Sequence, residues 1–322
     1  MIDSVRNTVL SILNKNNYGY ISPSDFNLFA KQAQLDLFDD YFYQYNYQIN
    51  KENARQSGTG YADIKKGYEE VIETFGVTNY LTTTSTLLNT VSIGSKFYLP
   101  AQLYTGDDYY LINKVLAYET TRATGTTTSI LANSLDDGTA TFISDGVKVG
   151  DVVFNLRTPS SLTNATVTQV LSENILVLSS DIFTANGSAY VVFSPKQNEL
   201  DKVSQGKITL LNNSMLTSPN RLFPVYSQEG GVLTAYPDSL FAGIQCQYIR
   251  YPKDPKWTYV TLTNGEPVFN SGQADYQDFE LSIDDQVDLV TKILQYAGMS
   301  IREIQAVQFG KSEEQYNDQQ EK

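Results

Sequence analysis

The 322-residue sequence contains no histidine and a single cysteine, Cys246. Without histidine there is no base for a catalytic triad, and one cysteine allows neither an internal disulfide nor a cysteine zinc site. The sequence also has no apolar run of about 18 residues, and residues 1–6 do not combine a basic start with an apolar segment. We therefore expect neither a membrane span nor a secretory signal, and a protein that is assembled in the cytoplasm.

Charge is scarce and unbalanced. Asp, Glu, Lys and Arg make up 18% of the chain, and the net charge is −13. No run of Lys and Arg occurs, which argues against attraction to phosphate backbones or anionic lipid. Polarity comes instead from Thr, Ser, Asn and Gln, which favours β-structure and broad uncharged surfaces. Acidity is nevertheless compatible with a role in conducting DNA, because DNA then slides past without adhering.

Tyrosine is abundant, with 23 copies. Its ring is apolar and its tip is polar, so it is enriched where proteins meet, although it also lines the rims of cores. An apolar stripe of helical spacing starts at Phe26 and reaches residues 41–47. Such a stripe is usually core or a helix contact, and a ligand groove is the alternative. We predict a subunit interface at the aromatic residues Tyr41, Phe42, Tyr43, Tyr45 and Tyr47.

Three helices are predicted near the N-terminus. Apolar residues recur with helical spacing over residues 5–13. Ser22 and Pro23 mark the start of a second helix, because a capping hydroxyl precedes a proline that fits the first turn. The third helix covers residues 64–75 and ends at Gly76.

The strongest helical pattern lies in residues 275–308. Its apolar positions share one side of a helix: Val287, Val290, Ile293, Leu294 and Ala297. Ser282 or Asp284 caps its start, and Gly298 supplies a left-handed stop. A capping box that begins at Ser300 predicts a second short helix.

Two short helices cannot bury their own apolar faces. The N-terminal helices are the other strongly helical part of the chain, so both ends are predicted to form one helical body. Its predicted core residues are Phe29, Leu37, Val287, Val290 and Leu294.

Helical periodicity vanishes between residues 120 and 195, where short alternating runs are separated by Asp-Gly, Gly-Asp and Asn-Gly turns. That spacing predicts a small barrel or sandwich inserted into the main domain. The predicted strands around it are residues 96–100, 109–118, 222–227, 232–236 and 244–251. The last three are predicted to form an antiparallel set, with a hairpin turn at residues 229–231.

The predicted fold class is therefore α+β, with a helical body from both chain ends, an antiparallel β-sheet middle and an inserted all-β barrel or sandwich module. Residues 1–119 hold the N-terminal helices and first strands of the main domain, and residues 120–195 form the inserted module. Residues 196–274 complete the β-rich main domain. Residues 275–322 supply the C-terminal helices that pack on the N-terminal ones.

No catalytic, cofactor-binding or metal site emerges from the sequence. The run Gly310-Lys311-Ser312 resembles the end of a phosphate loop but lacks the earlier glycine and the preceding strand. Four carboxylates have the chemistry for calcium without the alternating spacing of a calcium loop, so turn formation explains them better: Asp136, Asp137, Asp145 and Asp151. A glycosidase needs two facing carboxylates, and no specific pair is indicated. We predict no enzymatic activity.

Several stretches resemble structural proteins of crAss-like bacteriophages. They read VRNTVL and NYGYISP near the N-terminus, continue over residues 26–47, and return as QYIRYPKDPKW from Gln247 and as residues 275–308. The runs GVKVGDVV from Gly146 and LSSDIF from Leu178 are similar to small β-modules inserted in many phage structural proteins. The resemblance implies a virion protein, either a ring or an adaptor of the head-tail connector and tail.

The resemblance further implies a homo-oligomeric ring of about twelve copies that joins the portal protein to neighbouring tail and ring proteins. Genome DNA passes through its lumen without specific binding, and no membrane is involved. The protein is then located in the virion neck or tail, after assembly in the bacterial host cytoplasm. The alternative is a tail protein that binds a receptor or a glycan through the β insertion.

Overall fold

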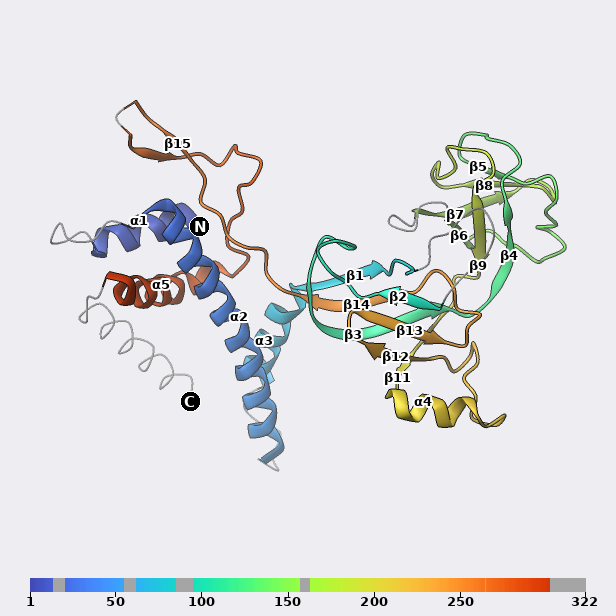
Figure 1. Cartoon of the computed structure of the whole chain (residues 1–322), viewed down its shortest axis with the longest axis horizontal. Coiled ribbons are helices and arrows are strands. Elements are labelled where there is room, and N and C mark those ends of the chain that lie inside the picture. The colour runs from blue at the N-terminus through green and yellow to red at the C-terminus, as the bar shows by residue number, and fades with distance from the viewer. Residues whose placement is uncertain (14–20, 55–61, 85–94, 157–162, 264, 302–322) are drawn as a thin grey trace. The chain divides into compact units, whose positions relative to one another are not determined.

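The computed structural model describes residues 1–13, 21–54, 62–84, 95–156, 163–263 and 265–301 (Figure 1). The chain divides into two compact units, Met1–Phe75 with Pro252–Lys322, and Gly76–Tyr251. We call them the helical unit and the sheet unit. The predicted mixture of helix and antiparallel sheet is confirmed, with 27% helix, 31% strand and a curled half-barrel sheet. Within the described ranges, no helix is both long and apolar enough to cross a membrane.

The helical unit contains α1 (Ile2–Leu13), α2 (Pro23–Ala54), α3 (Ala62–Glu73), the 3-10 helix η2 (Ile283–Asp285) and α5 (Gln286–Ile301). The start of α2 is as predicted. The Asp25 amide donates a hydrogen bond to Ser22 Oγ (3.1 Å), and Ser22 Oγ donates to the Asp25 carboxylate (2.7 Å). The side chain of Ser282, one of the two predicted caps, accepts a bond from the Asp284 amide at 3.4 Å.

One hydrophobic core joins α1, α2 and α5. Its buried residues include Val5, Val9, Phe26, Ala30, Leu37, Leu289, Val290, Ile293, Leu294 and Ala297. Three predicted core residues, Leu37, Val290 and Leu294, lie in this core, and Phe29 packs partly buried against it. Because α1 and α2 come from one end of the chain and α5 from the other, this core ties the two ends together.

The prediction for Val287 is wrong, since its side chain is 70% exposed. The buried face of α5 is centred on Leu289, Ile293 and Ala297, which follow one another at intervals of four residues. At about 100° per residue, Val287 lies about a third of a turn from the centre of that face. It also belongs to the first helical turn, where α1 and α2 do not cover it.

The predicted end of α5 is also wrong. The helix continues through Gly298 and includes Ser300, so Gly298 is not a stop and Ser300 does not open a new helix. A glycine permits a left-handed turn without requiring one, and its cost inside a helix is only about 0.5–1 kcal/mol relative to alanine. The rest of the predicted second helix, residues 302–308, lies outside the described residues.

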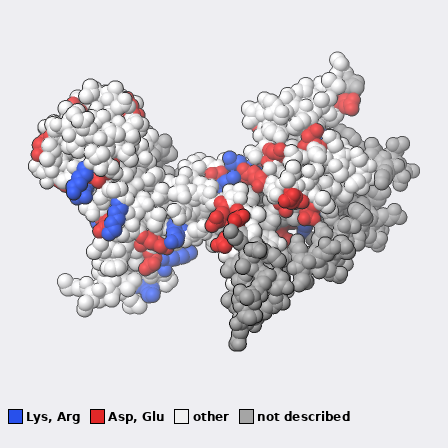
Figure 2. Space-filling view, turned by 180° about the vertical axis from the view of Figure 1, so that it is seen from behind, with Lys and Arg blue, Asp and Glu red and all other residues white. Residues whose placement is uncertain are grey.

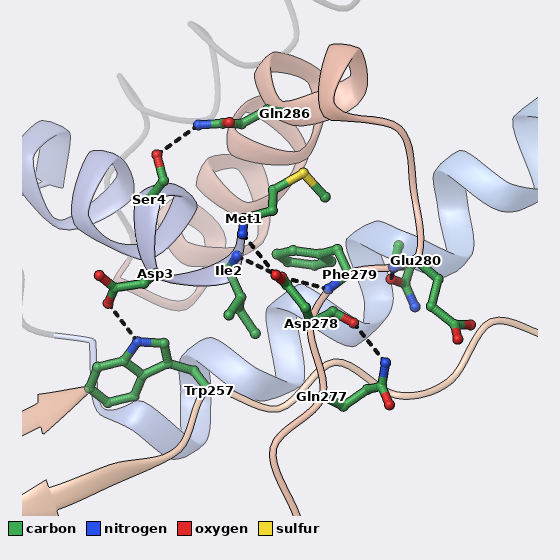
Figure 3. A network of polar contacts seen from close by, with 11 residues as sticks. Met1, Ile2, Asp3, Ser4, Trp257, Gln277, Asp278, Phe279, Glu280 and Gln286 are labelled. Atoms are coloured by element: carbon green, nitrogen blue, oxygen red, sulfur yellow. Dashed lines mark hydrogen bonds and ion pairs between the residues drawn. The ribbon is translucent and has the colours of Figure 1, made fainter. Parts of the chain in front are cut away.

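The first residues of the chain are bonded to a segment that precedes α5 (Figure 3). The Asp278 carboxylate accepts hydrogen bonds from the Met1 ammonium and from the Ile2 amide, each at 2.8 Å. Beside them, the Trp257 indole N–H donates to the Asp3 carboxylate at 2.9 Å. These bonds fix the start of α1 on the returning part of the chain.

A two-stranded hairpin completes the helical unit, made of β15 (Tyr259–Thr261) and β16 (Pro267–Phe269) (Figure 1). Trp257 stacks against Tyr259 and Phe269, with ring centroids 5.6 Å and 5.9 Å away. Because two strands alone are marginally stable in water, this stacking is what holds the hairpin on the helical unit.

The sheet unit has two four-stranded sheets around a shared core. The first has the order β1-β14-β3-β10, from β1 (Gly76–Tyr80), β14 (Gln245–Arg250), β3 (Tyr109–Tyr118) and β10 (Gln197–Glu199). The second has the order β11-β12-β13-β2, from β11 (Asp201–Lys202), β12 (Val225–Glu229), β13 (Val232–Tyr236) and β2 (Lys96–Tyr98). Strands occur in each predicted region, but the one predicted at residues 222–227 begins at Val225, so residues 222–224 are not strand. Gly230 turns the β12–β13 hairpin with a φ of 56°. The predicted single set is wrong, because β14 pairs with β1 and β3 and not with β13.

Residues 120–195 form a six-stranded antiparallel sheet, which we call the β-module. Its order is β4-β9-β6-β7-β8-β5, from β4 (Thr121–Thr126), β9 (Ala189–Phe193), β6 (Val152–Asn155), β7 (Thr163–Val170), β8 (Ile175–Leu178) and β5 (Ser134–Asp136). It has a core of its own, which includes Leu135, Phe142 and Leu176. A smaller cluster joins it to the rest of the sheet unit through Phe193 and Tyr118, whose rings stack at 5.1 Å.

Candidate assembly surfaces

The predicted aromatic interface is only partly available to another molecule. Tyr41 is buried, and its hydroxyl donates a 2.5 Å hydrogen bond to Asp285. Burial, helped by that bond, raises the pKa of Tyr41 above its ordinary value. Phe42 is partly covered and contacts the Phe38 ring edge-on at 5.1 Å. Tyr41 is therefore corrected from interface to internal packing, because its position on α2 faces the start of α5.

The remaining tyrosines of the predicted interface differ in exposure. Tyr43 is 65% exposed, whereas Tyr45 and Tyr47 are partly buried. Tyr43 alone of the predicted set therefore presents most of its side chain to a partner.

Each of the four aspartates weighed for calcium accepts a hydrogen bond from a residue within seven positions of sequence. Asp137 accepts bonds from the Thr139 amide (2.9 Å) and hydroxyl (2.7 Å), and Asp151 accepts one from the Lys148 amide (2.8 Å). Asp136 accepts from Ser129 and Asp145 accepts from Thr141. Among the described residues, no three carboxylates or cysteines are grouped so as to hold a metal ion.

Five strongly exposed apolar residues of the sheet unit lie on and after α4 (Gln205–Asn212), which is beside β12 (Figure 1). We call them the α4 surface: Leu210, Met215, Leu216, Leu222 and Phe223. Their side chains are between 57% and 102% exposed. Scattered single apolar residues are ordinary on a protein surface, but these five lie within 14 positions of sequence, so we treat the segment as a candidate contact site.

The segment that carries the α4 surface is held by specific bonds. Arg221 donates to the Ser239 carbonyl at 2.6 Å and to the Ser239 hydroxyl at 3.3 Å. Asn220 accepts from the amides of Leu222 and Phe223, each at 2.9 Å. Asn198 donates to the Arg221 carbonyl at 2.9 Å. The exposed side chains are thus displayed from an anchored backbone.

Sequence reasoning missed this surface, because residues 199–215 show no clear helix or strand periodicity and residues 222–227 are predicted as a strand. One signal was present. Residues 203–223 contain two basic residues, Lys207 and Arg221, and no carboxylate, in a chain of net charge −13. A 21-residue stretch without a carboxylate is unusual in so acidic a protein, and this absence could have identified the segment as a candidate surface.

A second exposed apolar site, the η2–α5 patch, lies on the helical unit. It consists of Ile283 (75% exposed) and Val287 with the exposed carboxylate of Asp284. Ile283 and Val287 are four residues apart, so they share one side of the helical segment. Gln286, between them, donates to Ser4 Oγ at 2.9 Å and fixes the segment on α1.

The β15–β16 hairpin exposes a third site. Val260, Leu262 and Val268 are between 44% and 49% exposed. Val260 and Val268 are directly opposite each other in the hairpin register. The hairpin therefore has one face against Trp257 and one apolar face in solvent.

The two units differ in charge. The helical unit has 13 Lys and Arg against 23 Asp and Glu, a net charge of −10, and the sheet unit has 10 against 13, a net charge of −3. On the face drawn in Figure 2, the described basic side chains stand singly or in small groups among acidic ones. Most of the negative charge therefore belongs to the helical unit.

No protein-family model matches the chain, and no curated protein matches it in sequence.

Proposed function

We propose that the protein is a non-enzymatic subunit of a closed ring in the neck or tail of a crAss-like phage. The ring joins the portal protein to neighbouring tail and ring proteins and lines the passage for genome DNA. In this proposal both units contribute to the contacts between copies, and the six-stranded β-module is an insertion in the sheet unit.

The observation that carries the proposal is that one chain presents unlike exposed apolar sites on its two units. The α4 surface is apolar with nearby basic residues, whereas the η2–α5 patch is apolar with a carboxylate. A cyclic ring requires heterologous contacts, in which one surface of each copy meets a different surface of the next. Unlike sites on one chain suit that arrangement better than a two-fold dimer, which needs a single self-complementary surface.

The charge distribution supports the same assignment. The helical unit has a net charge of −10. Placed toward a lumen, acidic side chains repel the phosphate backbone and keep the genome from adhering as it passes. We therefore assign the helical unit to the lumen side of the ring.

A reconstruction of the purified virion tests the proposal. We expect this chain as a closed ring between portal and tail, with about twelve copies if it follows the symmetry of a cyclic portal. Placement at the tail tip as isolated trimers, or on peripheral fibres, would overturn the ring assignment. A protein that binds a receptor or a glycan through the β-module would then replace it.

A further inference from the structure

The α4 surface carries one exposed cation, Lys207, whereas the Arg221 side chain is partly buried and its Nη1 is inaccessible to a partner. Lys207 is exposed and lies three residues before Leu210 on α4, so both side chains share one side of the helix. No ion pair with a described carboxylate involves Lys207 or Arg221. Arg221 is bonded through Nε and Nη2 to Ser239 alone, and burial lowers its pKa. A carboxylate from outside the sheet unit would complete this surface.

The η2–α5 patch has the complementary composition. Ile283 and Val287 supply apolar contact area, and the exposed Asp284 stands between them in sequence. The patch belongs to the unit with a net charge of −10, so the field around it favours a basic partner. Two surfaces that dock on each other need apolar side chains at the centre of both, with charges of opposite sign on the two rims.

We infer that the α4 surface of one copy docks on the η2–α5 patch of the next copy. The contact is head to tail, because the two sites lie on different units of the chain. The inference rests on the proposed ring function for its biological meaning. The choice of these two surfaces rests on their exposure and their opposite charges. Met215 and Leu216 form the apolar centre of the contact, and Lys207 faces Asp284 at its rim.

Disulfide capture in the full chain tests the contact. The only native cysteine, Cys246, is buried, and burial raises the pKa of its thiol to about 12, so it gives little background reaction. We expect a Leu216→Cys chain and a Val287→Cys chain, mixed and mildly oxidised, to form a covalent heterodimer. The double variant should give a ladder of covalent multimers. A matched control pairs Val287→Cys with Leu103→Cys, an exposed position between β2 and β3 that is outside the α4 surface, and should not cross-link.

Three other cross-linking results would each overturn the proposed contact. Cross-linking of Leu216→Cys to itself would indicate a two-fold interface, and a double variant that closes within one chain would make the contact internal. Absence of cross-linking in the mixture would contradict it directly. If the virion nevertheless contains a ring of this chain, the ring proposal stands and the contact is elsewhere. If cross-links form but the virion places the chain on fibres, the contact stands and the ring proposal fails.

Charge-reversal variants test the proposed ion pair between Lys207 and Asp284 at the edge of the contact. Lys207→Glu should weaken self-association about two- to fivefold, as expected for an exposed ion pair, and Asp284→Lys should do the same. The chain that carries both exchanges should recover the original association, measured by sedimentation velocity over a concentration series. Failure of the double exchange to recover would contradict the pairing of these two residues.

Discussion

The hydroxyl of Tyr41 donates a 2.5 Å hydrogen bond to the carboxylate of Asp285 and so joins α2 to the segment that leads into α5. These residues are 244 positions apart in sequence. The bond is charge-assisted and partly buried, which makes it stronger than an average side-chain bond.

Tyr41→Phe removes this bond and should lower the free energy of unfolding by about 1–2 kcal/mol. Urea denaturation followed by circular dichroism measures the change. The control is Tyr43→Phe, at an exposed hydroxyl two residues away, which should unfold like the parent. Equal midpoints for the two variants would mean that the Tyr41 bond contributes nothing to stability.

Stability should fall as pH rises above about 10. Burial raises the pKa of Tyr41, Tyr118 and Tyr190 above the ordinary value of 10.0, and neighbouring hydrogen-bond partners add to the effect. In that range the folded chain keeps these protons while the unfolded chain loses them, so the slope of stability with pH is negative. Unfolding midpoints between about pH 8 and about pH 11 measure it. Tyr41→Phe should make the slope shallower, and an unchanged slope would show that Tyr41 does not contribute.

Leu294→Asp should destabilise the helical unit by about 3–5 kcal/mol, because it places a carboxylate in the core shared by α1, α2 and α5. The matched variant on the same helix is Val287→Asp. Its side chain is exposed, so its melting temperature should stay within about a degree or two of the parent. A Leu294→Asp variant that melts like Val287→Asp would contradict the shared core.

Excision of residues 120–195 should leave a folded protein with its helical signal intact. The two ends of the β-module are neighbours, since the Glu119 amide donates to the Lys196 carbonyl at 3.0 Å, so a short Gly/Ser linker closes the gap. The excision uncovers Tyr118, which stacks on Phe193, so some loss of stability in the sheet unit is expected. Loss of the helical circular dichroism signal would show that the β-module is not separable.

Locally encoded features could be predicted from the sequence. Ser22 and Pro23 mark the start of α2, which begins at Pro23. The strand β3 occupies the predicted residues 109–118, whose aromatic and β-branched content favours a strand. Long-range contacts could not be predicted in this way. The partners of Asp278 and Trp257 lie more than 250 positions away, and no local pattern encodes them. Val287 fits a helical stripe by spacing, but only packing decides which side of the stripe is covered.

The candidate sites were harder to predict than the fold. Tyr41 and Tyr43 have the same residue type on the same helix, yet one is buried and the other is exposed. Exposure of Met215 and Leu216 follows from the loop that Arg221 and Asn220 anchor, which apolar content alone does not reveal. An apolar side chain predicts burial by default, so a surface made of such residues is found only once the fold is known.

The common core of α1, α2 and α5 also constrains when the protein can assemble. During synthesis, α1 and α2 emerge first and expose their apolar faces until α5 is translated, more than 200 residues later. At about 5–20 residues per second, this interval lasts on the order of ten seconds or more, a period in which chaperones can hold the nascent chain. The η2–α5 patch is itself made from residues near 283–287, so a ribosome-bound or truncated chain that lacks them has nothing to offer the α4 surface of a finished copy. If the proposed contact between copies forms, a chain can therefore join the ring only after residues 283–287 have been translated and folded.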